Sequence, residues 1–299
     1  MAATEQTISV NAPSITRTGS SSLTISSVVW FVVLVIVSVI FIFPFFWTLT
    51  SSLKQPYEIF NFPPTLFPAV PQWQNYATVF RIAPFFQWIL NSIFVVVAGT
   101  LGVVLSSSIV AYSFARFRYR GRELIFVITL GTMMIPAQIT LIPQYVLYTH
   151  MGWINTLYPL WVPFWFGGGA FYIFLLRQFF MTIPRELDEA ALMDGAGYFR
   201  IFWNILLPLC IPALATVMII SFIGSWGDFL GPLIYLNSPD KFTVAMGLYF
   251  FQNNPDLGGA PTQQLLMAAS VVTVIPCLIL FFFAQRYFIQ GVVLSGIKG

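Results

Sequence analysis

Six long apolar runs constrain the fold of this chain more than any other feature of its sequence. A helix crosses the hydrocarbon core of a bilayer with about 20 apolar residues. Runs of about that length cover residues 28–49, 85–114, 124–147, 160–180, 209–236 and 265–288. A membrane-spanning β-barrel would instead show short segments of alternating hydropathy. The sequence therefore predicts an all-α integral membrane protein with six transmembrane helices.

The charge content supports this prediction and excludes several functions. Only 8% of the 299 residues are charged, whereas a soluble domain carries about 25%. The net charge of +3 is too small to indicate a nucleic-acid partner. His150, Cys210 and Cys277 are too few and too scattered for a metal site. Without a glycine-rich phosphate loop in the sequence, we expect no catalytic residue, metal or cofactor in this chain.

Basic residues are divided unequally between the two sets of loops. Ten of the thirteen Lys and Arg residues fall on the side that holds both chain ends, and four of these lie in the hairpin at 116–122. Because positive charge accumulates in cytoplasmic loops, both termini are predicted to be cytoplasmic. The hairpin has a second interpretation, as a binding site for a partner or for anionic lipid.

Three regions are expected along the chain. Residues 1–27 are rich in Ser and Thr and are predicted to form a disordered cytoplasmic tail. A signal peptide is the alternative, but the apolar run that follows is too long for one. Residues 28–290 then form the transmembrane domain, and residues 291–299 form a cytoplasmic C-terminal tail.

The loop at 183–208 has an unusual composition. Pro184 suits the first turn of a helix, and acidic residues follow it where the helix dipole favours negative charge. Small side chains line one face and two glycines then end the helix; these residues are Leu187, Ala190, Ala191 and Asp194, followed by Gly195 and Gly197. A second helix over 198–206 and Pro208 lead into the fifth span. The pattern predicts a cytoplasmic helix–turn–helix elbow that a second protein can approach closely; an amphipathic connector resting on the bilayer is the alternative.

The spacing of residues in this loop resembles a known motif. Glu189-Ala190-Ala191 is followed by three residues and Gly195, then by nine residues and Ile205, and after one more residue by Leu207-Pro208. This is similar to the EAA loop of binding-protein-dependent ABC importer permeases. The chain further resembles the smaller permease subunit of maltose-type carbohydrate importers, with matching stretches at 111–117, 134–143, 226–233 and 290–299. The last stretch departs from the family form at 292–294, where a Thr is expected.

The resemblance implies a type I ABC importer fold and one half of a transporter in the bacterial plasma membrane. A second homologous permease would complete the pore, two ATPase subunits would dock beneath it using ATP and Mg²⁺, and an extracytoplasmic binding protein would deliver a sugar. Glu189 is implied in the ATPase contact and Gly195 in the turn. The full set implied in coupling is Glu189, Ala190, Ala191, Asp194, Gly195, Ile205 and Pro208.

Polar residues inside the spans indicate a candidate substrate path, because such residues are costly in a bilayer and usually face the interior. They are Gln138 and Thr140 in the third span, with Ser225, Trp226 and Asp228 in the fifth. Trp226 has the chemistry to stack on a sugar ring. Packing is the alternative, as a third span kinked at Pro136 and Pro143 and an interfacial Trp in the fifth. For the glycines at 167–169, tight helix packing is preferred over local unwinding.

Other functions remain open at this point. A secondary transporter would need a charged relay, and Asp228 is the one acidic residue clearly inside a span. An intramembrane enzyme would need a nucleophile or metal motif, but neither Gly-x-Ser-x-Gly nor His-Glu-x-x-His occurs in the sequence. Within the importer class, a permease for another solute is the nearest alternative to a carbohydrate permease.

Overall fold

The computed structural model of the chain describes residues 25–253 and 263–296, and the regular elements in these residues are all helical. The chain divides into two compact units, residues 1–46 and 47–299. Helix α1 (Ile25–Ser52) starts in the first unit and ends in the second. Most of the predicted N-terminal tail lies outside the described residues, and its last three positions belong to α1.

The spans agree with the apolar runs of the sequence. Four helices are long and apolar enough to cross a membrane: Ser26–Ser52, Phe85–Arg116, Tyr158–Thr182 and Gln263–Gln285. Two bent pairs also qualify: Arg122–Met134 with Ala137–His150, bent by 97°, and Tyr198–Leu209 with Ile211–Trp226, bent by 78°. When each pair counts as one span there are six, one for each apolar run. The prediction of an all-α membrane protein is confirmed.

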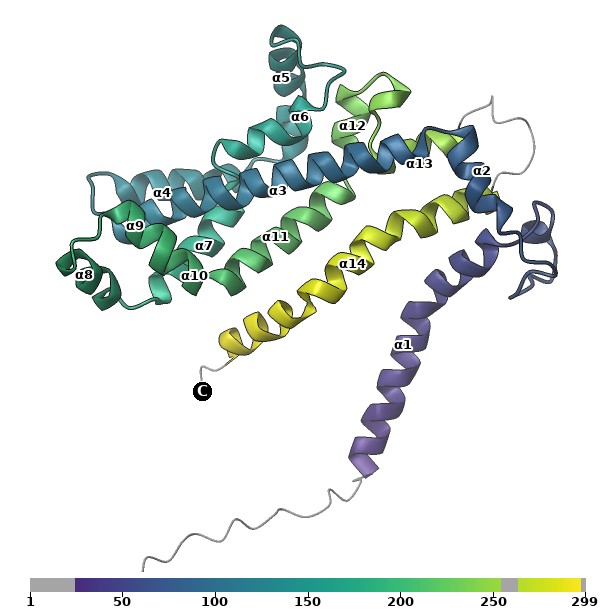
Figure 1. Ribbon diagram of the computed structural model, residues 1–299, viewed down its shortest axis with the longest axis horizontal. Coiled ribbons are helices and arrows are strands. Elements are labelled where there is room, and N and C mark those ends of the chain that lie inside the picture. Colours follow the sequence, from purple (N-terminus) through teal and green to yellow (C-terminus); the bar gives the residue numbers. More distant parts are fainter. Residues whose placement is uncertain (1–24, 254–262, 297–299) are drawn as a thin grey trace, which may run out of the picture. The chain divides into compact units, whose positions relative to one another are not determined.

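The second unit is built around α3 (Phe85–Arg116), a helix of 32 residues. In Figure 1, α7 (Ala170–Thr182) and α11 (Ile211–Trp226) pack along α3, and α14 (Gln263–Gly296) packs on α11. The shorter helices are α2 (Gln74–Ile82), α4 (Arg122–Gly131), α5 (Ala137–His150), α6 (Tyr158–Trp161), α8 (Glu186–Met193), α9 (Tyr198–Ile201), α10 (Leu207–Leu209), α12 (Leu230–Tyr235) and α13 (Val244–Asn253).

Small residues on α3 explain why other segments approach it so closely. Gly102 lies directly beneath the Trp165 ring, and a Cβ at this position would stand 2.6 Å from the Trp165 Cδ1 atom. The Trp165 Nε1 group donates a hydrogen bond to the Ala98 carbonyl at 3.1 Å. Close backbone approach at small residues, supported by such hydrogen bonds, is the usual way in which helices associate where lipid replaces water.

The third span is broken near its middle. α4 ends at Gly131, a 3-10 turn covers Thr132–Met134, and α5 begins after Pro136. Proline lacks an N–H group and disfavours a helical conformation in the residue before it, and Ile135 is accordingly extended with φ −81° and ψ 115°. α5 continues through Pro143. The kink expected from both prolines is therefore a single 97° break at the first one.

The fourth span is unwound at its three glycines, 167–169, whose φ angles are +105°, +65° and +119°. The preference for packing over unwinding was therefore wrong, although the middle glycine does also pack so closely that a Cβ there would overlap the Ser107 hydroxyl. Hydroxyl groups on α3 bind the carbonyls that the unwinding frees. Ser106 donates to the Phe164 carbonyl at 2.9 Å, and Ser107 donates to the Gly167 carbonyl at 3.3 Å. Non-helical backbone inside a membrane needs such partners.

The last two spans differ in length from their apolar runs. α11 ends at Trp226, well before position 236, because Gly227 closes the helix and the chain then turns into the separate α12. α11 itself begins only at Ile211, after a turn at Cys210, so Pro208 belongs to the preceding helix and does not begin α11. α14 continues as far as Gly296, and most of the predicted C-terminal tail is therefore helical.

Two buried clusters hold the second unit together. One contains Trp88, Phe242 and Trp226 and joins α3, α11, α13 and α14. The other contains Phe180 and Phe202 and joins α3, α7 and α11 to the segment between α7 and α11. This second cluster positions the 183–208 loop, which we call the candidate coupling loop.

Candidate functional site

The candidate coupling loop consists of two helices joined by a glycine turn. α8 ends in a Schellman arrangement, in which the Gly195 N–H donates to the Leu192 carbonyl at 3.0 Å and the Ala196 N–H donates to the Ala191 carbonyl at 2.9 Å. Gly195 has φ +80°, a left-handed conformation that strains any residue with a Cβ. Gly197 is extended, with ψ 160°, and α9 begins directly after it. The turn thus depends on glycine at position 195.

Polar contacts hold both helices of the loop against the end of α3. The Arg116 Nε atom lies 2.8 Å from Asp188 Oδ2, and these two side chains are only 6% and 16% exposed. Arg116 also donates to the Ile183 carbonyl at 3.1 Å, and the Tyr112 hydroxyl donates to the Tyr198 carbonyl at 3.2 Å. Burial raises the pKa of Asp188 above its usual range, although the positive charge of Arg116 opposes the shift.

The seven predicted coupling residues lie in different environments. Exposed positions are Glu189, Ala190, Asp194, Gly195 and Pro208, whereas Ile205 is half-buried and Ala191 is buried. Ala191 was expected on the same exposed face as Ala190. It instead packs into the cluster that contains Phe180 and Phe202. Ala191 therefore stabilises the loop from inside and is not available to a second protein.

The three most exposed large apolar side chains on this loop were not singled out from the sequence. Met193 is 89% exposed, Phe199 76% and Tyr198 55%, and they lie on either side of the Gly195 turn. With Glu189 and Ala190 they form what we call the loop surface. Exposed large apolar side chains in a segment predicted to be cytoplasmic mark an interaction site. The sequence could have indicated these side chains by their position, because they are large and apolar in a loop predicted to be cytoplasmic.

A cavity of about 480 Å³ lies elsewhere in the second unit, between α5, α6, α11 and α12. Polar and aromatic groups on its wall include Gln144, Tyr172, Ser225, Asp228 and Tyr235. The Tyr235 hydroxyl donates to Gln144 Oε1 at 3.3 Å, and Asp228 Oδ1 accepts from the Gly231 N–H at 3.2 Å. Asp228 is the single charged side chain among the described residues that line the cavity.

The structure brings two of the predicted path residues to this cavity and leaves three elsewhere. Ser225 and Asp228 line it. Gln138 is exposed on α5, and Thr140 donates to the Ala137 carbonyl at 2.8 Å. Trp226 is buried and stacks on Phe222 with ring centroids 5.7 Å apart, which favours the packing alternative for Trp226. Gln144 lines the cavity but was missed, because it lies next to Pro143 in a run treated as a kinked packing helix.

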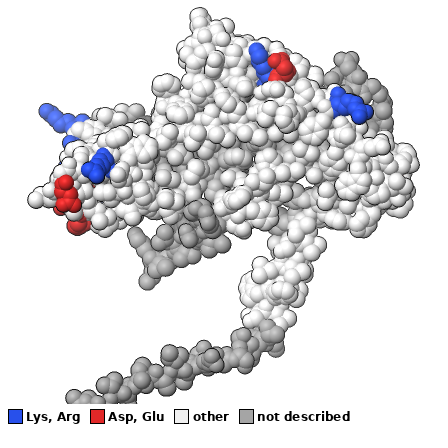
Figure 2. Space-filling model, in the orientation of Figure 1, with Lys and Arg blue, Asp and Glu red and all other residues white. Residues whose placement is uncertain are grey.

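Charged side chains gather in a few places on the face drawn in Figure 2. One group lies over the end that holds α4, α8 and α9, and others lie toward α2 and α12. The surface between these groups is uncharged in this view, as expected for a surface in contact with lipid. Among the residues that the structure describes, no three His, Cys, Asp or Glu side chains lie close enough to hold a metal ion.

Comparison with known proteins gives a family and several relatives. The sequence model of the family described as "Binding-protein-dependent transport system inner membrane component" matches residues 19–293. The arabinooligosaccharides transport system permease protein AraQ of Bacillus subtilis is 33% identical, covering 88% of this chain and 92% of the relative. The sn-glycerol-3-phosphate transport system permease protein UgpE of Yersinia pestis is 32% identical, covering 88% and 94%. The diacetylchitobiose uptake system permease protein NgcG of Streptomyces coelicolor is 34% identical, covering 85% and 83%.

Solved structures also match. A chain of a bacterial ABC transporter involved in the import of the acidic polysaccharide alginate aligns with a TM-score of 0.77 and 25% identity, covering 90% of this chain and 99% of the other. A chain of a bacterial alginate ABC transporter in complex with an alginate pentasaccharide-bound periplasmic protein aligns with a TM-score of 0.60 and 16% identity, covering 88% and 94%. The second match is a likeness of fold alone.

Proposed function

The chain belongs to the family of binding-protein-dependent transport system inner membrane components, and from this premise we propose that it is one permease half-subunit of an ATP-driven importer of neutral carbohydrates. A second, homologous permease completes the pore, and two ATPase subunits use ATP and Mg²⁺ beneath it. An extracytoplasmic binding protein delivers the sugar. The chain itself is a non-catalytic subunit.

The observation that carries the ATP-driven mechanism is the loop surface. Met193 and Phe199 are large, apolar and exposed on a short segment that is braced against the end of α3. Exposing such side chains to water costs free energy, and a docked partner removes this cost by burying them. Glu189 adds a negative charge on α8, the helix that also carries Met193. A site with an apolar centre and a charged edge fits the surface of an ATPase subunit, and the chain has no phosphate loop of its own.

The brace against α3 gives the loop surface a route into the membrane. Arg116 and Tyr112 stand in the last turns of α3, a membrane span, and bind the loop directly. A partner that moves α8 therefore moves the end of α3 as well. A flexible connector would bend under the same displacement, so these contacts support coupling over the alternative of a passive amphipathic linker.

The cavity supports a carbohydrate as the cargo. Tyr172 and Tyr235 present aromatic rings of the kind that pack against the C–H face of a sugar, and Gln144 and Ser225 present groups that hydrogen-bond hydroxyls. The names of two relatives, for arabinooligosaccharides and diacetylchitobiose, refer to cargo of this class.

The charge of the cavity supports a neutral cargo among carbohydrates and related solutes. Other matches are named for sn-glycerol-3-phosphate and for an acidic polysaccharide, so similarity alone leaves the charge of the cargo open. The described cavity wall holds one carboxylate, Asp228, and no Lys or Arg. In a medium of low dielectric constant a carboxylate repels an anion strongly, and no cation on this wall offsets the repulsion.

The placement of the chain follows from the positive-inside rule. The family match and the candidate spans show that the chain is a multi-pass membrane protein. We infer that both termini and the candidate coupling loop face the cytoplasm of a bacterial cell, because ten of the thirteen basic residues lie on the side of the predicted spans that holds these segments. The cavity wall formed by α12 then lies toward the outer half of the membrane, where a binding protein releases its sugar.

The test is transport by the complete complex in proteoliposomes, with the ATPase subunits on the outside and the binding protein inside. A panel of neutral oligosaccharides, uronates and sn-glycerol-3-phosphate is scored for stimulation of ATP hydrolysis. We expect stimulation by a neutral oligosaccharide and none by the anions. Stimulation by an anion alone would refute the neutral cargo, and uptake by this chain without its partners would refute the half-transporter.

The loop surface is tested with a matched pair of charge reversals on α8. Glu189→Lys should lower both retention of the ATPase during purification and sugar uptake. Glu186→Lys, at another exposed acidic residue in the first turn of α8, should leave both near wild type. Equal behaviour of the two variants at matched membrane expression would show that Glu189 has no special contact with the ATPase.

A further inference from the structure

A second cavity lies at the end of the molecule that carries the candidate coupling loop. It measures about 490 Å³ and lies between the start of α4 and the segment before α8. Its wall contains Arg118, Arg122 and Arg185, together with Tyr119, Glu123 and Leu124. We call it the basic pocket. The importer function proposed above does not use it.

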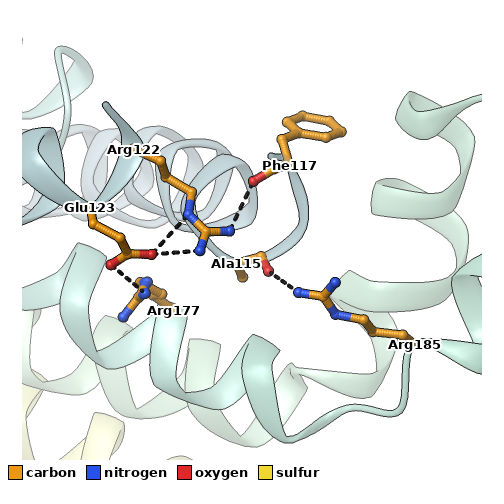
Figure 3. A network of polar contacts seen from close by, with 6 residues as sticks. All are labelled: Ala115, Phe117, Arg122, Glu123, Arg177 and Arg185. Carbon is orange, nitrogen blue, oxygen red and sulfur yellow. Dashed lines mark hydrogen bonds and ion pairs between the residues drawn. The ribbon is translucent and has the colours of Figure 1, made fainter. Parts of the chain in front are cut away.

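The basic pocket has an excess of positive charge. Figure 3 shows how Glu123 is occupied: its Oε1 atom accepts from Arg122 Nε at 3.0 Å, and its Oε2 atom lies 3.5 Å from Arg177 Nη2. Glu123 is thus shared between two guanidinium groups. In the described part of the chain, Arg118 and Arg185 have no carboxylate within 4.0 Å. Two guanidinium groups therefore remain for an anion from outside the chain.

The pocket is also organised before any ligand arrives. Arg122 donates to the Phe117 carbonyl at 3.0 Å as well as to Glu123, and Arg185 donates to the Ala115 carbonyl at 3.4 Å (Figure 3). Gly121, with φ +83°, turns the chain so that α4 begins at the pocket. The N-terminus of a helix favours an anion through its free N–H groups and its dipole. Guanidinium groups and this helix end together match a phosphate.

The surface next to the basic pocket identifies the kind of molecule that brings the phosphate. α4 leaves the pocket as the first half of a bent span, and its outward side chains Leu124, Val127 and Ile128 are exposed. Acyl chains can follow this apolar face while the head group stays in the pocket. A soluble anion or an acidic protein would not be bound more tightly by an apolar face that enters the bilayer.

We propose that the basic pocket binds the phosphate of an anionic phospholipid, with the acyl chains lying along α4. Arg118 and Arg185 contact the phosphate, while Arg122 is held in place by Glu123. The bound lipid would fill the angle between the α3–α4 hairpin and the candidate coupling loop, since Arg185 directly precedes α8. This proposal concerns a structural lipid site and does not depend on the identity of the cargo.

The experiment measures lipid binding to the complete transporter by native mass spectrometry, with phosphatidylglycerol, phosphatidylcholine and inorganic phosphate as separate probes. We expect phosphatidylglycerol to bind more tightly than phosphatidylcholine and inorganic phosphate not to compete at equal concentration. Arg118→Gln combined with Arg185→Gln should weaken phosphatidylglycerol binding by roughly 30-fold, equivalent to about 2 kcal/mol for two basic residues at a membrane surface.

The matched control is Arg120→Gln, an exposed arginine on the same hairpin that does not line the basic pocket. It should leave phosphatidylglycerol binding near wild type. Equal loss in the control and the double variant would reduce the effect to general surface charge and overturn the proposal. Full displacement by inorganic phosphate would assign a free-phosphate site instead. Lipid binding by the chain alone but not by the complex would show that a partner protein occupies the pocket; either outcome overturns the proposal.

Discussion

Removing Arg116 should loosen the candidate coupling loop far more than neutralising its partner, Asp188. At their separation of 2.8 Å the two charges attract with about 6 kcal/mol at an effective dielectric constant of about 20. Desolvation of both ions offsets most of this attraction, in agreement with the burial that raises the pKa of Asp188. The ion pair therefore adds little net stability to the loop, and its main effect is that neither buried charge is left without a partner of opposite charge.

The two single substitutions leave different groups behind. Arg116→Met leaves the buried Asp188 carboxylate without its cation and also removes the donor to the Ile183 carbonyl, which should cost about 3–5 kcal/mol. After Asp188→Asn, Arg116 keeps the Ile183 carbonyl and the C-terminal end of α3, where the helix dipole favours a cation. We expect a loss of about 1–2 kcal/mol. The double variant should be less destabilised than Arg116→Met alone.

Hydrogen exchange of the α8 amides, measured on the full-length protein in detergent, reports the local stability of the loop. The defect of Arg116→Met should shrink as the pH falls, because Asp188 has a raised pKa in the folded state. The folded state then binds the proton more tightly than the unfolded one, and stability increases when the pH falls through that raised value. Arg120→Met serves as a control on an exposed arginine of the same hairpin. Strictly additive losses in the double variant, or a pH-independent defect, would refute the reasoning.

Other substitutions test the turn, the packing and the topology. Gly195→Ala should destabilise the loop by about 1 kcal/mol or more, because φ +80° is strained for alanine even though no atom lies within 4 Å of the new methyl group; unchanged sugar uptake at matched expression would show that the turn tolerates a side chain. Gly247→Ala should lower the melting temperature in detergent, since its Cβ would overlap the Trp88 ring, whereas Gly224→Ala has free space and should leave it unchanged or slightly higher; equal shifts would contradict the packing argument. In a background without native cysteines, a cysteine at Gly121 should react with an impermeant maleimide only from the cytoplasm, and one at Gln72 only from outside; the opposite labelling would overturn the topology.

The sequence predicted those features that depend on neighbouring residues along the chain. Apolar runs located the four spanning helices and the two bent pairs, because hydropathy over about 20 residues is enough to define a candidate span. The glycine turn at 195 was also predictable, because a left-handed helix end needs only a local pattern. The break at Pro136 was anticipated in position, but its 97° angle depends on how the two halves pack.

Features that depend on distant partners were not predictable in the same way. Arg116 was interpreted as a topology marker, although it is also the ion-pair partner of Asp188, 72 positions away along the chain. Ala191 lies within a small-residue face, but only the packed cluster around Phe180 decides that its methyl group points inward. For Trp226, residue chemistry suggested a sugar platform, whereas its buried stack on Phe222 favours packing. One sequence contains no record of such pairings.

α3 and the join at Cys210 differ in mechanical stiffness, and this difference determines how a push on α8 would spread. α3 is one uninterrupted helix of 32 residues, about 48 Å long. It is fixed to α8 at Arg116 and, at Val95, reaches the wall of the cavity that contains Ser225 and Asp228. The other route, through α10 into α11, passes a 78° bend at Cys210. α3 would therefore move as a rigid rod, while the chain flexes at Cys210. A small displacement of α8 beneath the membrane would then widen or narrow the cavity next to Val95.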